Sequence, residues 1–104
     1  MFVTNTEEMH GKTITTCLGV VSGSTVRAKH LGRDIMAGLK NLVGGELVGY
    51  TELLGEARDQ AMDRMKDQAS QLGANAIVNV RYSTSSITSG ASEIYVYGTA
   101  VIVE

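Results

Sequence analysis

The sequence contains no proline, no tryptophan, one phenylalanine and one cysteine among its 104 residues. The single cysteine, Cys17, excludes an internal disulfide, which suits a reducing compartment. Without proline, no strand or helix is interrupted by a residue that lacks a backbone N–H. Aromatic residues make up only 5% of the chain, so the core must be built from Val, Ile, Leu, Ala and the five Met.

Basic charge and long apolar runs are also scarce. Nine Lys and Arg residues are scattered along the chain against eleven Asp and Glu, so we expect no nucleic-acid partner. No stretch reaches the roughly 18–20 apolar residues of a membrane helix, and we expect no membrane partner. Residues 1–12 lack the basic start and apolar run of a secretory signal. These absences predict one cytoplasmic domain over residues 1–104.

Hydrophobic periodicity predicts three strands and a short helix. Apolar and polar residues alternate over residues 13–21, and residues 74–83 and 92–103 form two further strands joined by a Ser, Thr and Gly-rich loop. Leucine and isoleucine recur at helical spacing over residues 31–42, and the glycines at 44–45 would end that helix.

The longest periodic segment, residues 51–73, predicts an amphipathic helix with a narrow apolar stripe. The stripe consists of Leu54, Ala57, Ala61, Met65, Ala69 and Leu72. Thr51 is the expected N-cap and Gly73 the expected left-handed C-cap. Together the elements predict an α+β fold. It is a two-layer α/β sandwich in which one long helix covers a three-stranded antiparallel sheet, with the short helix after the first strand.

Strict alternation divides the predicted sheet into two faces. The face under the helix, where Gly98 and Ala100 would receive it, takes Val78, Val80, Tyr82, Ile94, Val96, Gly98, Ala100 and Ile102. The opposite face takes Ile77, Asn79, Arg81, Tyr95, Tyr97, Thr99, Val101 and Val103, with Cys17 and Val21 from the first strand. This second face is too apolar for water and too polar for a sealed core. Since Tyr and Arg are enriched at protein interfaces, we expect other copies of the chain to cover it, the alternative being a half-wet face.

Candidate metal ligands and catalytic groups are few. His10, Cys17 and His30 show no spacing typical of a metal site, so a site closed within one subunit is not expected. In a ring of subunits, Cys17 thiolates could converge near the axis and bind a metal ion; the alternative is a buried, inert cysteine. No nucleophile lies at a diagnostic spacing from a base, and the acidic residues of the long helix are typical of a solvated surface.

Several motifs resemble the YbjQ family of small, functionally uncharacterised proteins. They are "GVVSG" at residues 19–23, "GG" at 44–45, "EARDQAMDRM" at 56–65, "GANAIVNVRYSTSS" at 73–86 and "YGTAV" at 97–101. The resemblance implies a dodecin-subunit-like fold and a propeller-like homopentamer, or a decamer of two such rings. The family also carries the description heavy-metal-binding, so the resemblance implies that the protein binds a heavy-metal ion, but this description names no activity.

This sequence departs from one branch of the family at two positions. Glu46 follows the glycine pair where Arg is expected, and Ser24 follows "SG" where Glu is expected. Arg58, within the family-like "EARDQA", is expected to pair with Glu46 or Glu93 at a subunit contact.

Two classes of function follow. The first is a non-enzymatic oligomeric binding or scaffold protein that holds heavy-metal ions or a small ligand between subunits. The alternative is an enzyme whose active site forms across the subunit interface. The expected interface residues are Asn79, Arg81, Tyr95 and Tyr97 from the sheet, with Arg58 and Glu46.

Overall fold

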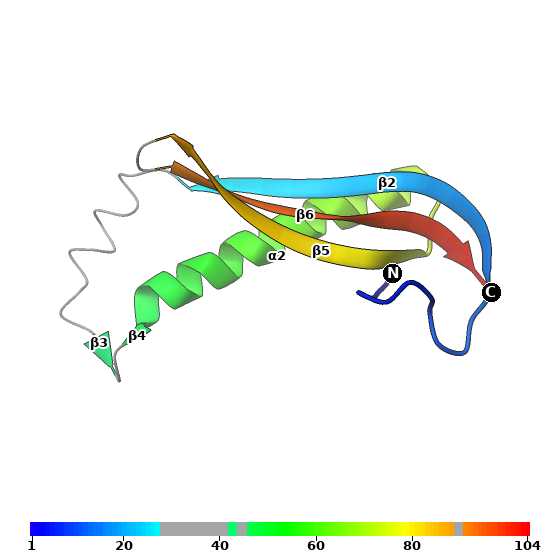
Figure 1. The fold of residues 1–104 in the computed structure, drawn as a ribbon, viewed down its shortest axis with the longest axis horizontal. Coiled ribbons are helices and arrows are strands. Elements are labelled where there is room, and N and C mark those ends of the chain that lie inside the picture. Colours follow the sequence, from blue (N-terminus) through cyan, green and yellow to red (C-terminus); the bar gives the residue numbers. More distant parts are fainter. Residues whose placement is uncertain (28–41, 44–45, 89–90) are drawn as a thin grey trace.

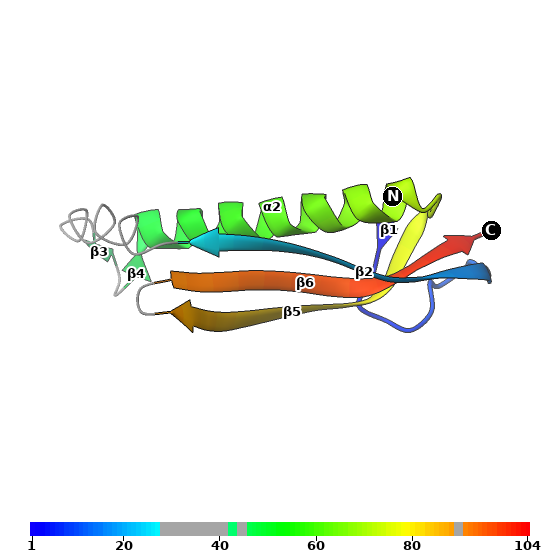
Figure 2. The same cartoon turned by 90° about the horizontal axis from the view of Figure 1, so that it is seen from above.

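The structure is a computed structural model that describes residues 1–27, 42–43, 46–88 and 91–104. One long helix lies along one face of a sheet built from three long strands and one short strand (Figure 1, Figure 2). In chain order the elements are β1 (Phe2–Val3), β2 (Ile14–Arg27), β3 (Leu42–Val43), β4 (Glu46–Leu47), α2 (Val48–Gln71), β5 (Ala76–Thr88) and β6 (Ala91–Val103).

The sheet has the strand order β1-β5-β6-β2 and is mixed. β5 and β6 form the predicted antiparallel hairpin, and β2 pairs antiparallel with the other edge of β6. A fourth strand, β1, runs parallel to β5. The expectation of a purely antiparallel three-stranded sheet is therefore wrong at one edge, because a two-residue strand is too short to show a period. The predicted short helix over residues 31–42 lies outside the described residues, except for Leu42 in β3, which pairs with β4.

The long helix confirms the predicted stripe and C-cap. Ala57, Ala61, Met65 and Ala69 are fully buried, whereas Leu72 at the end of the stripe is 47% exposed. Gly73 has a φ of 87°, and the Ala74 N–H donates to the Ala69 carbonyl at 3.1 Å, which is the hydrogen bond of a Schellman cap. The predicted N-cap is wrong: α2 begins at Val48, so Thr51 lies inside the helix.

The helix backbone sits directly on β2 at Gly23. A Cβ added at Gly23 would lie 2.0 Å from the Ala61 carbonyl oxygen and 2.6 Å from the Met65 nitrogen. Only glycine permits this approach. The expectation that Gly98 receives the helix is wrong, because a Cβ there would meet the Ile77 side chain of β5 at 2.8 Å.

Side chains of α2 also reach around the edge of β2. The Ser22 N–H donates to Oε1 of Gln68 at 2.7 Å, and Arg64 donates to the Ser24 carbonyl. These bonds occupy one backbone donor and one backbone acceptor along an edge strand that pairs on its other side with β6. Such edges are otherwise free to pair with another chain.

Irregularities in β5 and β2 reverse the predicted alternation of their side chains. Asn79 has a φ of 57° where the β5–β6 register shifts, and Gly19 has a φ of 116° where the β2–β6 register shifts. An extra residue in a strand puts the residues on its two sides out of phase, so those on one side of it turn to the face opposite the one that strict alternation predicts. Contrary to the prediction, Ile77 and Val21 therefore face the helix and are buried, whereas Val78 lies on the opposite face, opposite Thr99.

The N-terminal segment covers one end of the second sheet face. Val78, Val101 and Val103 form a buried cluster there with Ala76, and Met9 and Ile14 pack against it. The expectation that other copies cover Val101 and Val103 is thus wrong. The same segment satisfies the irregular part of β5, because the N–H groups of Asn79 and Val80 donate to the Thr6 and Thr4 carbonyls at 2.9 and 3.1 Å.

Candidate functional site

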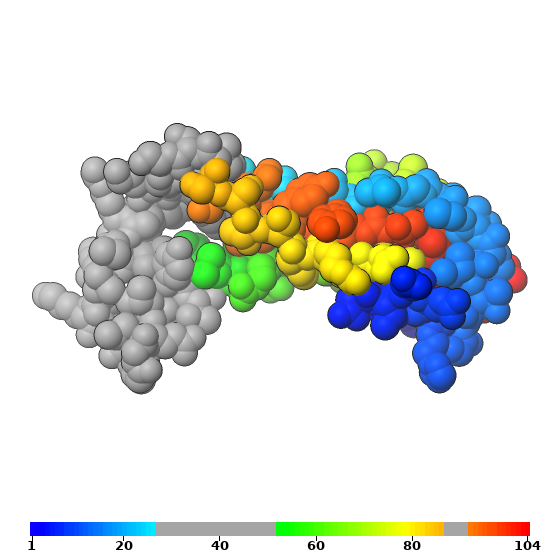
Figure 3. Space-filling view, viewed as in Figure 1, coloured from blue at the N-terminus to red at the C-terminus, as the bar shows by residue number. Residues whose placement is uncertain are grey.

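The described residues of one copy of the chain leave the rest of that second face uncovered. We call it the open face; its members are Val20, Ser22, Ser24 and Val26 of β2, Arg81 and Ser83 of β5, and Tyr95, Tyr97 and Thr99 of β6. β6 runs along its middle, between β5 and β2, and the N-terminal segment lies at one end (Figure 3). Val20 is 74% exposed, Val26 52% and Tyr97 38%. These exposures leave three large hydrophobic side chains of this face in contact with water, among serine and threonine hydroxyl groups.

Two tyrosines form the centre of the open face. Tyr95 and Tyr97 are two residues apart on β6, so they project on the same side, and their rings stack with centroids 5.5 Å apart. Tyr97 lies between Ser22 on β2 and Arg81 on β5 in the strand register. A rigid aromatic pair flanked by small hydroxyl side chains offers a flat surface to a partner or a ligand.

Arg81 is held beside Tyr97 by the N-terminal segment. Its Nη1 donates to the Asn5 carbonyl at 2.7 Å and to the Val80 carbonyl at 3.0 Å. Both partners are neutral carbonyls, and within the described part of the chain no carboxylate forms an ion pair with this guanidinium. The charge of Arg81 is therefore fixed in position and is not neutralised there.

A pocket of about 310 Å³ opens on this face next to Arg81. It is lined by Val20, Asn79, Arg81, Tyr97, Gly98 and Thr99. A second hollow, of about 620 Å³, lies on the other side of Asn79 and Arg81 and is lined by residues 5–12, which include Glu7, Glu8 and Lys12. The two hollows share Asn79 and Arg81 but differ in charge. Arg81 is the one formally charged residue that lines the first, whereas Glu7, Glu8 and Lys12 also line the second.

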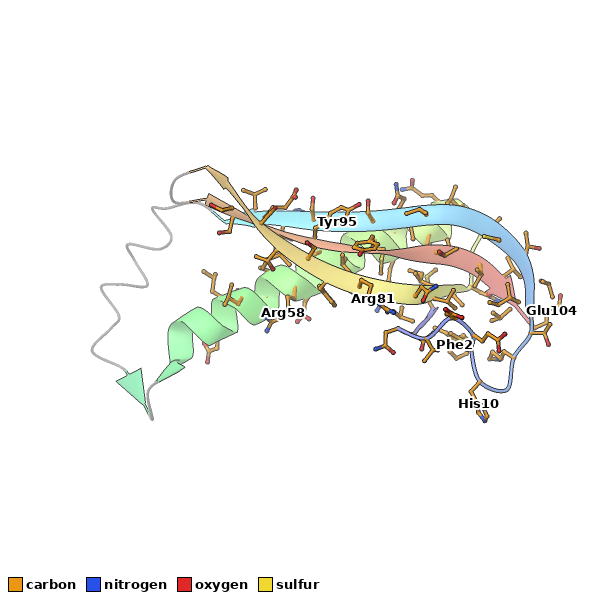
Figure 4. The ribbon with its side chains drawn as sticks, viewed as in Figure 1. Phe2, His10, Arg58, Arg81, Tyr95 and Glu104 are labelled. Atoms are coloured by element: carbon orange, nitrogen blue, oxygen red, sulfur yellow. The ribbon has the colours of Figure 1, made fainter. Side chains whose placement is uncertain are left out.

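The six predicted interface residues do not all lie together. Asn79, Arg81, Tyr95 and Tyr97 gather on or beside the open face. Arg58 comes from α2, away from Arg81 and Tyr95 on the sheet (Figure 4). Glu46 opens β4, and its side chain lies outside the described part of the chain. Strict alternation did not place Val20 on the open face, because it does not allow for the register shift at Gly19. A glycine inside a strand pattern is the signal that could have revealed this shift.

Tyr82 faces the helix side, opposite Val96, yet is 47% exposed. The reason is that α2 packs mainly over β2 and β6 rather than over β5. Partial burial raises the pKa of Tyr82 and the Asp59 carboxylate raises it further, whereas the Arg58 guanidinium lowers it. Arg58 and Asp59 thus lie along the uncovered strip between α2 and β5.

The candidate metal ligands are not brought together. Cys17 lies on β2 opposite Val101 and is exposed in one copy of the chain, so its own fold does not bury it. His10 points away from the sheet at the turn of the N-terminal segment (Figure 4), and His30 lies outside the described residues. Across the described ranges, no three His, Cys, Asp or Glu side chains gather as a metal site would require.

No helix in the described part of the chain has the length and hydropathy needed to span a bilayer. A crystal structure of a protein with unknown function from Pediococcus pentosaceus, which belongs to the DUF74 family, is similar in fold. Its TM-score is 0.65 and its identity 18%, over 100% of this chain and 98% of that one.

Two sequence relatives are much closer in identity. A UPF0145 protein of Hahella chejuensis is 62% identical over 104 residues, the full length of both chains. Another, of Acinetobacter baylyi, is 67% identical over 96 residues, which cover 92% of this chain and 89% of the relative. The model of the YbjQ family, described as "Putative heavy-metal-binding", matches residues 1–104. The chain therefore belongs to the YbjQ family.

Proposed function

We propose that the protein is a non-enzymatic cytoplasmic homo-oligomer whose subunits cover one another's open faces and hold a ligand between them. The observation that carries this proposal is the open face itself. Val20, Val26 and Tyr97 expose 74%, 52% and 38% of their surface on one side of a sheet whose other side is covered by α2 over β2 and β6. Contiguous apolar surface rimmed by polar groups is typical of a protein contact site.

A second copy of the chain is the occupant that the charges favour. Glu93 lies at one end of the open face, opposite Val26 and Ser85, and Arg81 lies nearer the middle. One face therefore carries both signs of charge, so a head-to-tail contact with an identical copy can bring opposite charges near each other, while the guanidinium of Arg81 stays available to a ligand between the copies. This complementarity supports a self-association contact.

The proposed number of copies is five, as a ring or as two stacked rings. The sheet and its exposed residues support a contact between copies but set no ring size; the number five rests on the resemblance to the YbjQ family. A cyclic arrangement repeats one contact around an axis, so every open face is covered equally.

The metal ion in the family's description finds no ligand set in one copy of the described chain. Cys17 is the one soft ligand on β2, and it is exposed beside the open face. If the protein binds a heavy metal, we propose that thiolates from several copies meet there.

Light scattering coupled to size exclusion tests the assembly. We expect a wild-type mass of about five times the 11.1 kDa of one chain, or twice that for two rings. Tyr97→Asp should give monomers or aggregate, because each contact would then bury an unpaired charge, while Val96→Asp, in the core under α2, should prevent folding. A folded wild-type protein of about 11 kDa at micromolar concentration would refute the assembly.

A matched control separates the open face from the rest of the surface. Leu72 is 47% exposed at the end of α2, comparable with Tyr97, but it lies away from the open face. Leu72→Asp introduces the same charge in place of a similarly exposed apolar side chain, and we expect the assembly to persist. Dissociation by both variants would show that the open face is not the specific contact.

A further inference from the structure

We propose that the 310 Å³ pocket on the open face binds a small organic anion, whose acidic group is held by Arg81 and whose flat apolar body packs against Tyr97 and Val20. This inference rests on the proposed ligand-holding function but does not require the ring. It names the chemical class of the ligand, a carboxylate or phosphate ester of a compact ring, and the residues that recognise it.

Charge is the first reason for an anion. Arg81 is the one formally charged residue among the six that line the pocket, and the others are neutral: Val20, Asn79, Tyr97, Gly98 and Thr99. The acidic residues Glu7 and Glu8 line the neighbouring hollow instead. A cation would meet only positive charge in this pocket, whereas an anion would meet an uncompensated guanidinium.

Geometry is the second reason. Two backbone carbonyls, of Asn5 and Val80, fix Nη1 of Arg81, which leaves the remaining donors of the guanidinium fork for a ligand. A planar fork binds a carboxylate or phosphate through two parallel hydrogen bonds. Because the guanidinium is already held in place, binding would order few further bonds of that side chain.

The remaining lining residues define the rest of the ligand. The Asn79 amide and the Thr99 and Tyr97 hydroxyl groups add neutral polar groups around the rim, while the Tyr97 ring and Val20 supply apolar walls. A pocket that is partly apolar with few polar groups is typical of small-molecule sites. The combination selects an acid with a flat apolar body over a bare inorganic ion.

Isothermal titration of the purified full chain tests the proposal with benzoate, phenyl phosphate, inorganic phosphate and benzamide. We expect benzoate or phenyl phosphate to bind, and benzamide, which has the same ring without the charge, to bind at least tenfold more weakly. Arg81→Gln should lower the affinity for the anion roughly ten- to a hundredfold, which is the usual effect of losing a hydrogen bond to a charged group. Inorganic phosphate binding as tightly as phenyl phosphate would overturn the role of Tyr97 and Val20.

Arg58→Gln is the matched control, because it removes the same charge from an exposed position on α2. It should leave the affinity unchanged; an equal loss in both variants would mean that the anion responds only to net charge, and would overturn the site. If Arg81→Gln fails to fold, Arg81→Lys and Tyr97→Ala replace it: lysine should retain part of the affinity, and loss of the ring should weaken binding.

The outcome is separable from that of the proposed assembly. Absence of binding by both acids to an assembled protein would overturn the anion site and leave the ring standing. Binding by a protein of monomer mass would support the site and refute the ring.

Discussion

Replacing Gly23 by alanine should separate the helix from the sheet. The new Cβ would lie 2.0 Å from the Ala61 carbonyl oxygen and 2.6 Å from the Met65 nitrogen, and both are backbone atoms that no rotamer change can move. Reaching even the 3.0 Å limit of real Cβ contacts requires the two layers to part by about 1 Å. A gap of that size forfeits about a quarter to a half of the dispersion energy of the atoms that line it.

The expected loss is large relative to the stability of a small domain. We expect Gly23→Ala to lower the free energy of unfolding by about 3 kcal/mol, the upper end for overpacked sites, out of a total of about 5–15 kcal/mol. In urea this corresponds to a fall of about 1–3 M in the denaturation midpoint. The measurement is urea denaturation followed by circular dichroism at one fixed chain concentration, because assembly would add its own contribution.

Gly55→Ala is the internal control for this experiment. Gly55 lies on α2, the helix that packs on Gly23, and a Cβ added at Gly55 meets nothing within 4 Å. The same substitution should therefore stabilise the protein by about 0.5–1 kcal/mol through helix propensity. If Gly23→Ala unfolds at the wild-type midpoint, the close seating of α2 on β2 is refuted.

Two further predictions concern the open face and the uncovered side of β5. Cys17 should react slowly with a thiol reagent in the assembled wild type and quickly in Tyr97→Asp; equal fast rates would place Cys17 outside the subunit contact. The raised pKa of Tyr82 means that its neutral form stabilises the fold below about pH 10 and that this stabilisation is lost as pH rises through the higher folded-state pKa. Tyr82→Phe should flatten the alkaline loss of stability, measured by denaturation at several pH values, and an unchanged alkaline decline would contradict the assigned cause.

The sequence predicted the long helix well because its signal is local. Ala57, Ala61, Met65 and Ala69 recur every four residues, and all are buried against the sheet. Gly73 could be placed as the C-cap for the same reason, since a left-handed residue just after a helix favours glycine. Both features depend on residues within one or two turns of each other.

The assignment of faces failed where a single residue breaks the period. Alternation places Ile77 and Val21 on the open face, but the shifts at Asn79 and Gly19 turn both toward α2. Beyond the shifts, Arg81, Tyr95 and Tyr97 lie on the open face as alternation predicts. The pocket could not be predicted, because it needs the side chain of Val20 to lie on the same face as Arg81 and Tyr97, and only the register shift at Gly19 places it there.

The position of β6 at the centre of the sheet has a consequence for the order of folding. β2 and β5 do not pair with each other, and the only long strand that either of them pairs with is β6, so Ile14 finds its partner Val103 only at the far end of the chain. A growing chain can form α2 early but no long-strand pair until residues 91–103 have been made. Contacts between such distant residues slow folding, because a long loop must close before the contact is gained. During synthesis β2 and the β6-facing edge of β5 therefore stay unpaired the longest, and a chain that stops before residue 91 lacks the long partner of both strands.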